Sequence, residues 1–144
     1  MLFPEFLYQL SARDQQVTWL DPVIARPETI DAAAFNVARF AVPDGRMLVV
    51  ANVCLHSFTA GVTTISLMRL TLFPPAGAGV MDLAIRTPVA GLTADVLNLN
   101  GLEVLVPAQW IVEARTTFSA GAAGNTTRLN LHGILLPIAN VQRI

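Results

Sequence analysis

From about residue 34 to the end of the chain, apolar and polar residues alternate with a period of two in short runs. Gly, Pro, Asn and Asp separate these runs at intervals typical of an all-β domain. Successive side chains of a strand point to opposite faces, so such alternation indicates strands with one buried face. About seven or eight runs recur, too many for one open sheet in 144 residues. We therefore expect an all-β fold, a two-sheet antiparallel sandwich and most specifically a jelly roll.

The alternation also predicts which side chains form the core. In the run 46–58 the odd positions from Met47 to Leu55 are all apolar, so these are expected to face inward. The other apolar faces expected in the core are Met81, Leu83, Ile85 and Val89; Trp110, Val112, Ala114 and Phe118; and Leu129, Leu131 and Leu135. The run 64–73 is apolar on both faces except at Arg69, which is typical of a central strand or of a strand covered by a partner.

Two turn sequences stand out between the runs. Pro43-Asp44-Gly45 combines a proline with a glycine that accepts positive φ, which predicts a tight turn. Asn100-Gly101 is the preferred sequence of a type I′ turn, so we expect a hairpin between 96–99 and 102–105. The loops 74–79 and 119–124 consist mainly of Ala, Gly and Pro and offer no catalytic side chains.

The first thirty residues follow a different pattern. Apolar and aromatic residues near the start have rough helical spacing, but Pro4 allows only a short helix, and prolines guide the rest as extended chain. We expect residues 1–30 to be an N-terminal arm rather than an independent domain, and residues 31–144 to form a single β-sandwich domain. The arm either packs on its own sandwich or reaches onto a neighbouring subunit.

The scarcity of charge constrains the surface. Charged residues make up 13% of the chain, about half of the usual 25%, so we expect much of the surface to face another protein. All nine basic residues are Arg; this reflects either genomic base composition or a surface built for burial, where Arg pairs and stacks better than Lys.

The net charge of −1 gives no general attraction to nucleic acid or to an anionic membrane. No apolar run is long enough for a membrane helix, and the sequence shows no secretory signal pattern. The single cysteine, Cys54, excludes an internal disulfide and indicates synthesis in a reducing compartment.

Residues with possible chemistry are few and scattered. Cys54 and His56 share a strand face, but two ligands do not make a metal site, and His132 is far along the chain. Ser57 and its neighbour His56 point to opposite faces, which disfavours a catalytic pair. The predicted outward carboxylates Glu103 and Glu113 have Arg115 and Arg128 as ordinary cross-strand partners. The absence of Lys excludes a Walker lysine and with it nucleotide hydrolysis by that machinery. Because none of these residues forms a recognisable catalytic or metal-binding pattern, we expect no enzyme, no metal and no cofactor.

The segment 106–144 resembles a recurring pattern in structural proteins of tailed-phage virions. Its elements are Pro107 with Trp110, the small-residue loop 119–124, Gly133 with Leu135 and Pro137, and a polar tail 140–144. Within that group the sequence is most similar to the jelly-roll cement, or decoration, proteins, which sit on the outside of the capsid shell.

That resemblance implies a nonenzymatic virion protein that clamps neighbouring capsid subunits and stabilises the shell. The implied partners are the major capsid protein and other copies of this chain, with no direct contact to nucleic acid or membrane; the implied location is the capsid exterior, after synthesis in the host cytoplasm. From the apolar character of the two termini we expect the following residues to contact a neighbour: Phe3, Phe6, Leu7 and Tyr8 in the arm, and Val141, Arg143 and Ile144 in the tail.

The main alternative is a receptor- or sugar-binding head of a phage tail fibre or spike. Such a head would carry aromatic and polar side chains on its exposed loop tips. The long loops of this sequence are instead rich in Ala and Gly, so the cement protein is the preferred hypothesis.

Overall fold

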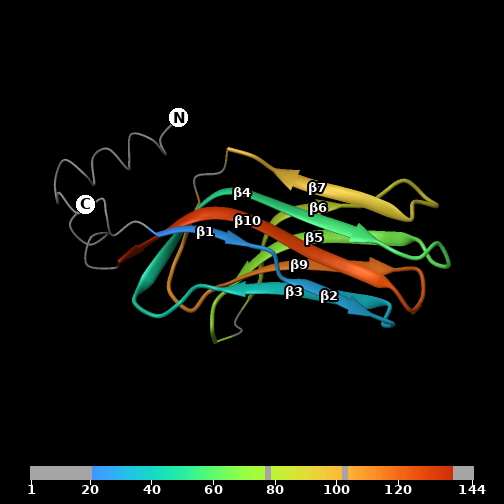
Figure 1. Ribbon diagram of the computed structural model, residues 1–144, viewed down its shortest axis with the longest axis horizontal. Helices are drawn as coiled ribbons and strands as arrows, with labels where there is room; N and C mark the ends of the chain where they lie inside the picture. Colours follow the sequence, from blue (N-terminus) through green and yellow to red (C-terminus); the bar gives the residue numbers. More distant parts are fainter. Residues whose placement is uncertain (1–20, 77–78, 102–103, 138–144) are drawn as a thin grey trace.

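The computed structural model describes residues 21–76, 79–101 and 104–137, and the regular elements of these segments are all β-strands (Figure 1). In chain order the strands are β1 (Asp21–Ala25), β2 (Glu28–Asp31), β3 (Phe35–Ala41), β4 (Arg46–Phe58), β5 (Ile65–Phe73), β6 (Met81–Arg86), β7 (Ala94–Leu99), β8 (Val104–Val106), β9 (Ile111–Phe118) and β10 (Asn125–Pro137).

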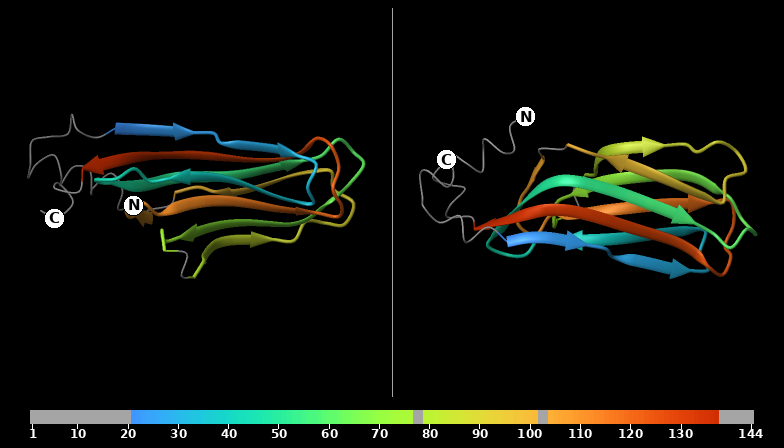
Figure 2. Two further views of the ribbon diagram at one scale, coloured as in Figure 1. Left: turned by 90° about the horizontal axis from the view of Figure 1, so that it is seen from below. Right: turned by 45° about the horizontal axis from the view of Figure 1, so that its top comes forward.

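These strands form two antiparallel sheets. In the six-stranded sheet, β1 and β2 both pair with β10, β10 pairs with β4, and β7 and β8 both pair with β4. The four-stranded sheet has the order β3-β9-β5-β6. If β1 and β2 are counted as one interrupted strand, and β7 and β8 as another, the order is that of a jelly roll. The predicted all-β sandwich is confirmed, and its strands run lengthwise through the molecule (Figures 1 and 2).

The predicted arm, residues 1–30, includes residues that belong to the sandwich. Residues 21–31 are not part of an arm but form β1 and β2, which pair with β10 at the edge of the six-stranded sheet. Pro22 and Pro27 have no N–H to donate, and an edge strand tolerates this because one side lacks a partner strand. Pro27 still contributes its carbonyl, which accepts a hydrogen bond from the Leu129 N–H at 3.0 Å.

The predicted core face of β4 is correct for only half of the strand. Leu48 and Val50 face the core before Ala51, whereas Val53 and Leu55 do so after it, because the strand register shifts opposite the step from His132 to Gly133. A β-bulge of this kind reverses the alternation between faces. Strict period-two reasoning therefore assigned Met47, Val49 and Ala51 to the wrong side of the sheet.

The hairpin predicted at Asn100-Gly101 does not form. Instead, β7 and β8 run in the same direction along one edge of β4, with Leu99 opposite Val53 and Val104 opposite Val50. Gly101 has a φ of 68°, as expected, but Asn100 is not in the left-handed region that a type I′ turn requires at both central residues. The two residues begin an interruption of one edge strand rather than a reversal of the chain.

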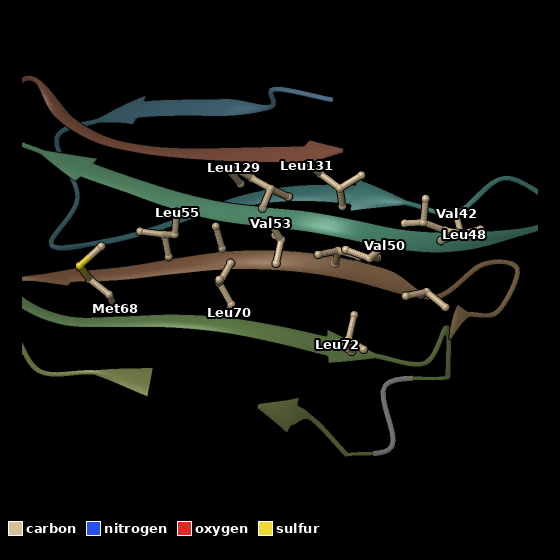
Figure 3. Close-up of a cluster of buried hydrophobic side chains, with 14 of the residues drawn as sticks. Val42, Leu48, Val50, Val53, Leu55, Met68, Leu70, Leu72, Leu129 and Leu131 are labelled. Atoms are coloured by element: carbon tan, nitrogen blue, oxygen red, sulfur yellow. The ribbon is translucent and has the colours of Figure 1, made fainter. Parts of the chain in front are cut away.

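The core lies between the two sheets. Figure 3 shows Val53 and Leu55 of β4 and Leu129 and Leu131 of β10 in the same buried cluster as Met68, Leu70 and Leu72 of β5. The predicted inward faces of β9 and β10 are confirmed, since Val112, Ala114, Phe118, Leu129 and Leu131 are at most 3% exposed. Complete burial of a large aliphatic side chain contributes about 1.5–3 kcal/mol.

The predicted inward face of β6 is largely wrong. Leu83 packs against the core, but Met81 and Ile85 are more than half exposed, and so is Val89 beyond the end of the strand. As the edge of the four-stranded sheet, β6 has only β5 as a neighbour, and its register shifts opposite Leu70 and Thr71. Of the two interpretations of the run 64–73, the central strand agrees with the structure, because β5 pairs with both β9 and β6.

A buried asparagine joins the loops at one end of the sandwich. Asn125 accepts a hydrogen bond from Thr63 Oγ1 at 2.9 Å and donates to the carbonyl oxygens of Ala33 and Ala120, each at 3.1 Å. Its side chain is fully buried. Asn125-Thr126-Thr127 matches the acceptor pattern for N-glycosylation, but the buried Asn125 side chain is inaccessible to that modification in the folded chain.

Candidate functional site

The residues expected from the sequence to contact a partner lie outside the described part of the chain. Phe3, Phe6, Leu7 and Tyr8 belong to residues 1–20, and Val141, Arg143 and Ile144 belong to residues 138–144. They stay a prediction. Within the described residues, two other surfaces concentrate functional side chains, one on the outside of each sheet.

The first surface, here called the arginine face, covers the outside of the four-stranded sheet. It consists of Phe35 and Arg39 of β3, Arg69 and Phe73 of β5, Asp82 of β6, and Glu113 and Arg115 of β9. At its centre the Glu113 side chain is fully buried, although it points away from the core. Both Arg39 and Arg115 donate to its carboxylate.

Neighbouring carboxylates and aromatic rings hold the three arginines in place. Arg69 and Arg115 lie directly opposite each other on adjacent strands, an arrangement that is unfavourable without counter-charges. Glu113 supplies one, and Asp82 supplies the other through hydrogen bonds of 2.8 and 2.9 Å from Arg69 Nη2. The guanidinium of Arg39 also lies 5.5 Å from the ring centroid of Phe73, within range of a cation–π interaction.

The arginine face has the composition of a protein interface. Arg and aromatic residues are enriched at interface centres, and their order before binding reduces the entropy lost on association. The arginine side chains remain accessible, with Arg39 52% exposed. The sequence named Arg115 and Arg128 as cross-strand partners of Glu103 and Glu113, but Arg115 pairs with Glu113 within β9 and Arg128 pairs with Glu28. Sequence reasoning missed Arg39, because only the sheet order places β3 beside β9.

The second surface is a polar groove on the outside of the six-stranded sheet, with a volume of about 550 Å³. It is lined by Arg26, Asn52, Val53, Cys54, His56, Asn98, Asn100, Arg128, Asn130 and His132. The sequence indicated that Cys54 and His56 share a face, and the structure confirms it. His132, distant in sequence, lies on the adjacent strand β10 opposite Asn52.

The groove shows binding groups rather than a reactive centre. Desolvation by burial raises the pKa of the Cys54 thiol above its usual value, which favours the less nucleophilic protonated form. Ser57 lies on the opposite side of β4 from His56, where its hydroxyl is 2.6 Å from that of Thr116. Among the described residues, no group of three or more His, Cys, Asp or Glu side chains is placed to hold a metal ion.

Comparisons with known proteins identify no family for this chain. No protein-family model matches the chain, and no curated protein matches it. Among solved structures, the Drosophila NLP core aligns with 78% of this chain and 97% of its own, at 12% identity and a TM-score of 0.35. That crystal structure concerns pentamer formation and histone binding by that protein, and a likeness this weak carries no argument about function. In the described part of the chain, no helix has the length and apolar character to cross a membrane.

Proposed function

We propose that this chain is a capsid cement, or decoration, protein of a tailed-phage virion. In this role it binds the outside of the capsid shell and clamps neighbouring capsid subunits. Its partners are the major capsid protein and other copies of itself, and it catalyses no reaction. It is made in the host cytoplasm and ends on the capsid exterior.

The arginine face is the observation that carries this proposal. A shell-binding protein needs an ordered surface that loses little entropy on docking, and the ion pairs around Glu113 order Arg39 and Arg115 in advance. The resemblance of residues 106–144 to virion proteins and the low charge content support the same conclusion.

The mechanism is thermodynamic. A clamp that binds the assembled shell but not its free subunits shifts the assembly equilibrium by mass action. Each contact is modest, but many copies act on one particle, and a clamp that engages two subunits gains from effective concentration. Apolar termini that reach across a seam between subunits would supply the second contact.

The first test is the copy number of this chain in purified particles from its source, measured by quantitative mass spectrometry against the major capsid protein. We expect a ratio near one per capsid subunit or a simple fraction of it. A few copies per particle would favour the head of a tail fibre or spike. Absence from particles would overturn the proposal.

The second test assigns the docking surface. The double variant Arg39→Ala/Arg69→Ala should bind purified shells at least tenfold more weakly, because truncation of a hot-spot residue at an interface centre costs about 2 kcal/mol or more and about 1.4 kcal/mol is already tenfold. The matched control is Asn98→Ala on the opposite sheet, which should bind shells like the unmodified chain. Equal binding by the double variant would show that the arginine face is not the docking surface.

A further inference from the structure

We propose that the polar groove binds an acidic oligosaccharide, a ligand that bears both hydroxyl groups and a carboxylate. This inference goes beyond the proposed role on the shell and does not depend on it. It rests on the kind of side chains that line the groove, on their positions in the sheet, and on the charge balance.

The side chains of the groove are suited to hydroxyl groups. Asn130, Cys54 and Asn98 lie side by side on β10, β4 and β7, so the small thiol side chain is flanked by two carboxamides. Each carboxamide both donates and accepts hydrogen bonds, as does a sugar hydroxyl. Within the described chain, the side chains of Asn98, Asn130 and His132 have no hydrogen-bond partner, so their polar groups remain available to a ligand.

The positive charge of the groove favours an anionic ligand. Its lining contains two guanidinium groups and no carboxylate. Arg128 already donates to Glu28 and lies over the ring of Phe58. Arg26 makes no ion pair with any described residue, so its planar donor pair is free to hold a ligand carboxylate.

A peptide or nucleic acid fits this surface less well. The backbones of β10 and β4 are paired on both sides, so neither offers an edge for an added strand. The apolar side chain nearest the groove, Val53, is fully buried in the core and leaves no pocket for a peptide side chain. One unpaired arginine is far too little positive charge for a polyanionic backbone.

The size of the groove fits a small ligand. Its volume of about 550 Å³ lies within the range of small-molecule sites.

The test is binding of the full chain to an immobilised panel of uronate- and sialate-bearing oligosaccharides, each printed beside its neutral counterpart. We expect at least one acidic member to bind and its neutral counterpart to bind at least tenfold more weakly. Asn98→Ala/Asn130→Ala should abolish this binding, and Arg26→Gln should reduce it to the level of the neutral sugar. Arg69→Gln, on the opposite sheet, is the control and should bind normally.

Three results would overturn the proposal. The first is no binding to any acidic member of the panel. The second is binding that the groove variants leave unchanged while their thermal unfolding midpoints match that of the unmodified chain. The third is competition by sodium acetate or inorganic phosphate at the same concentration as the oligosaccharide, since this would indicate a simple anion site.

Discussion

At the scale of single residues, the most unusual environment is that of Glu113. It lies on the solvent side of a sheet and yet is fully buried, because Arg39 and Arg115 cover it. Asp82 makes a similar pair with Arg69, but both side chains are about one-third exposed. Glu113 and Asp82 therefore allow the same kind of ion pair to be compared at two different degrees of burial.

Glu113→Gln should destabilise the fold by about 2–3 kcal/mol, because two arginines lose the buried carboxylate that they share as a counter-charge. The loss stays below that of a fully interior pair, since Arg39 is half exposed and can regain hydration. Asp82→Asn, the matched control, should cost less than about 1 kcal/mol. Urea unfolding of both variants measures the difference, and equal costs would contradict this account.

Cys54 gives a pH-dependent prediction. Burial raises the pKa of its thiol above the ordinary value of 9.0, so the folded chain holds this proton to a higher pH than the unfolded chain. The raised pKa of the thiol therefore makes its full contribution to the free energy of unfolding below pH 9.0. This contribution is lost as the pH rises through the pKa of the folded chain.

Alkylation by iodoacetamide reads out this proton directly, because the thiolate is the nucleophile and the chain has one cysteine. The rate for the folded chain should reach its half-maximum above pH 9.0. The same chain in urea is the control and should show a lower midpoint. Identical midpoints in the two conditions would show that folding does not perturb the thiol.

At the scale of elements, the bulge between β4 and β10 determines which side chains reach the core. It depends on Gly133, where an added Cβ would lie 2.4 Å from the carbonyl oxygen of Val49 and 3.0 Å from Leu48 Cδ1. Because the first neighbour is backbone, the strands would have to separate to make room. Gly133 therefore permits the bulge, and the bulge keeps Leu48 and Leu55 on the same side of the sheet.

Gly133→Ala should destabilise the sandwich by about 1–3 kcal/mol, the usual cost of overpacking. Gly45→Asn is the control, because Gly45 has a φ of 71° in a turn with free space around it, and Asn tolerates that conformation. Its cost should remain below about 1 kcal/mol. Thermal unfolding of both variants tests this, and a neutral Gly133→Ala would show that the two strands separate at no cost.

At the scale of the whole molecule, the two sheets present different chemistry to the outside. One carries arginines ordered by carboxylates and phenyl rings, and the other carries a groove of amides and imidazoles without a lining carboxylate. Under our two proposals, one face of this small domain docks on a protein and the other face holds a ligand. The variants of one face serve as controls for the other.

Deletion of residues 1–10 should release the protein from particles without unfolding it, because we expect the arm to contact a neighbour and the described sandwich begins at Asp21. Co-sedimentation with shells measures the release, and the thermal unfolding midpoint measures the fold. Loss of the folded state would instead place the arm in the core.

Sequence reasoning succeeded where local rules apply. Alternation predicted the inward faces of β9 and β10, and it placed Ser57 and His56 on opposite sides of β4. It failed where register or sheet order decides, as at Ala51 in the bulge and at Asn100-Gly101, which interrupts an edge strand. Sequence reasoning missed the groove for the same reason. Asn98 and Asn130 lie on either side of Cys54 only because β7 and β10 both pair with β4.

The sequence alone determined the fold class and the turn residues that separate the strands. Backbone geometry fixes the alternation of side chains within a strand and favours glycine or proline in turns. Only the tertiary structure decided which strands are neighbours, where the register shifts, and which distant side chains meet. Strand pairing joins segments such as β3 and β9, or β2 and β10, that are far apart along the chain. Both candidate surfaces depend on those pairings, since the side chains that define them come from different strands.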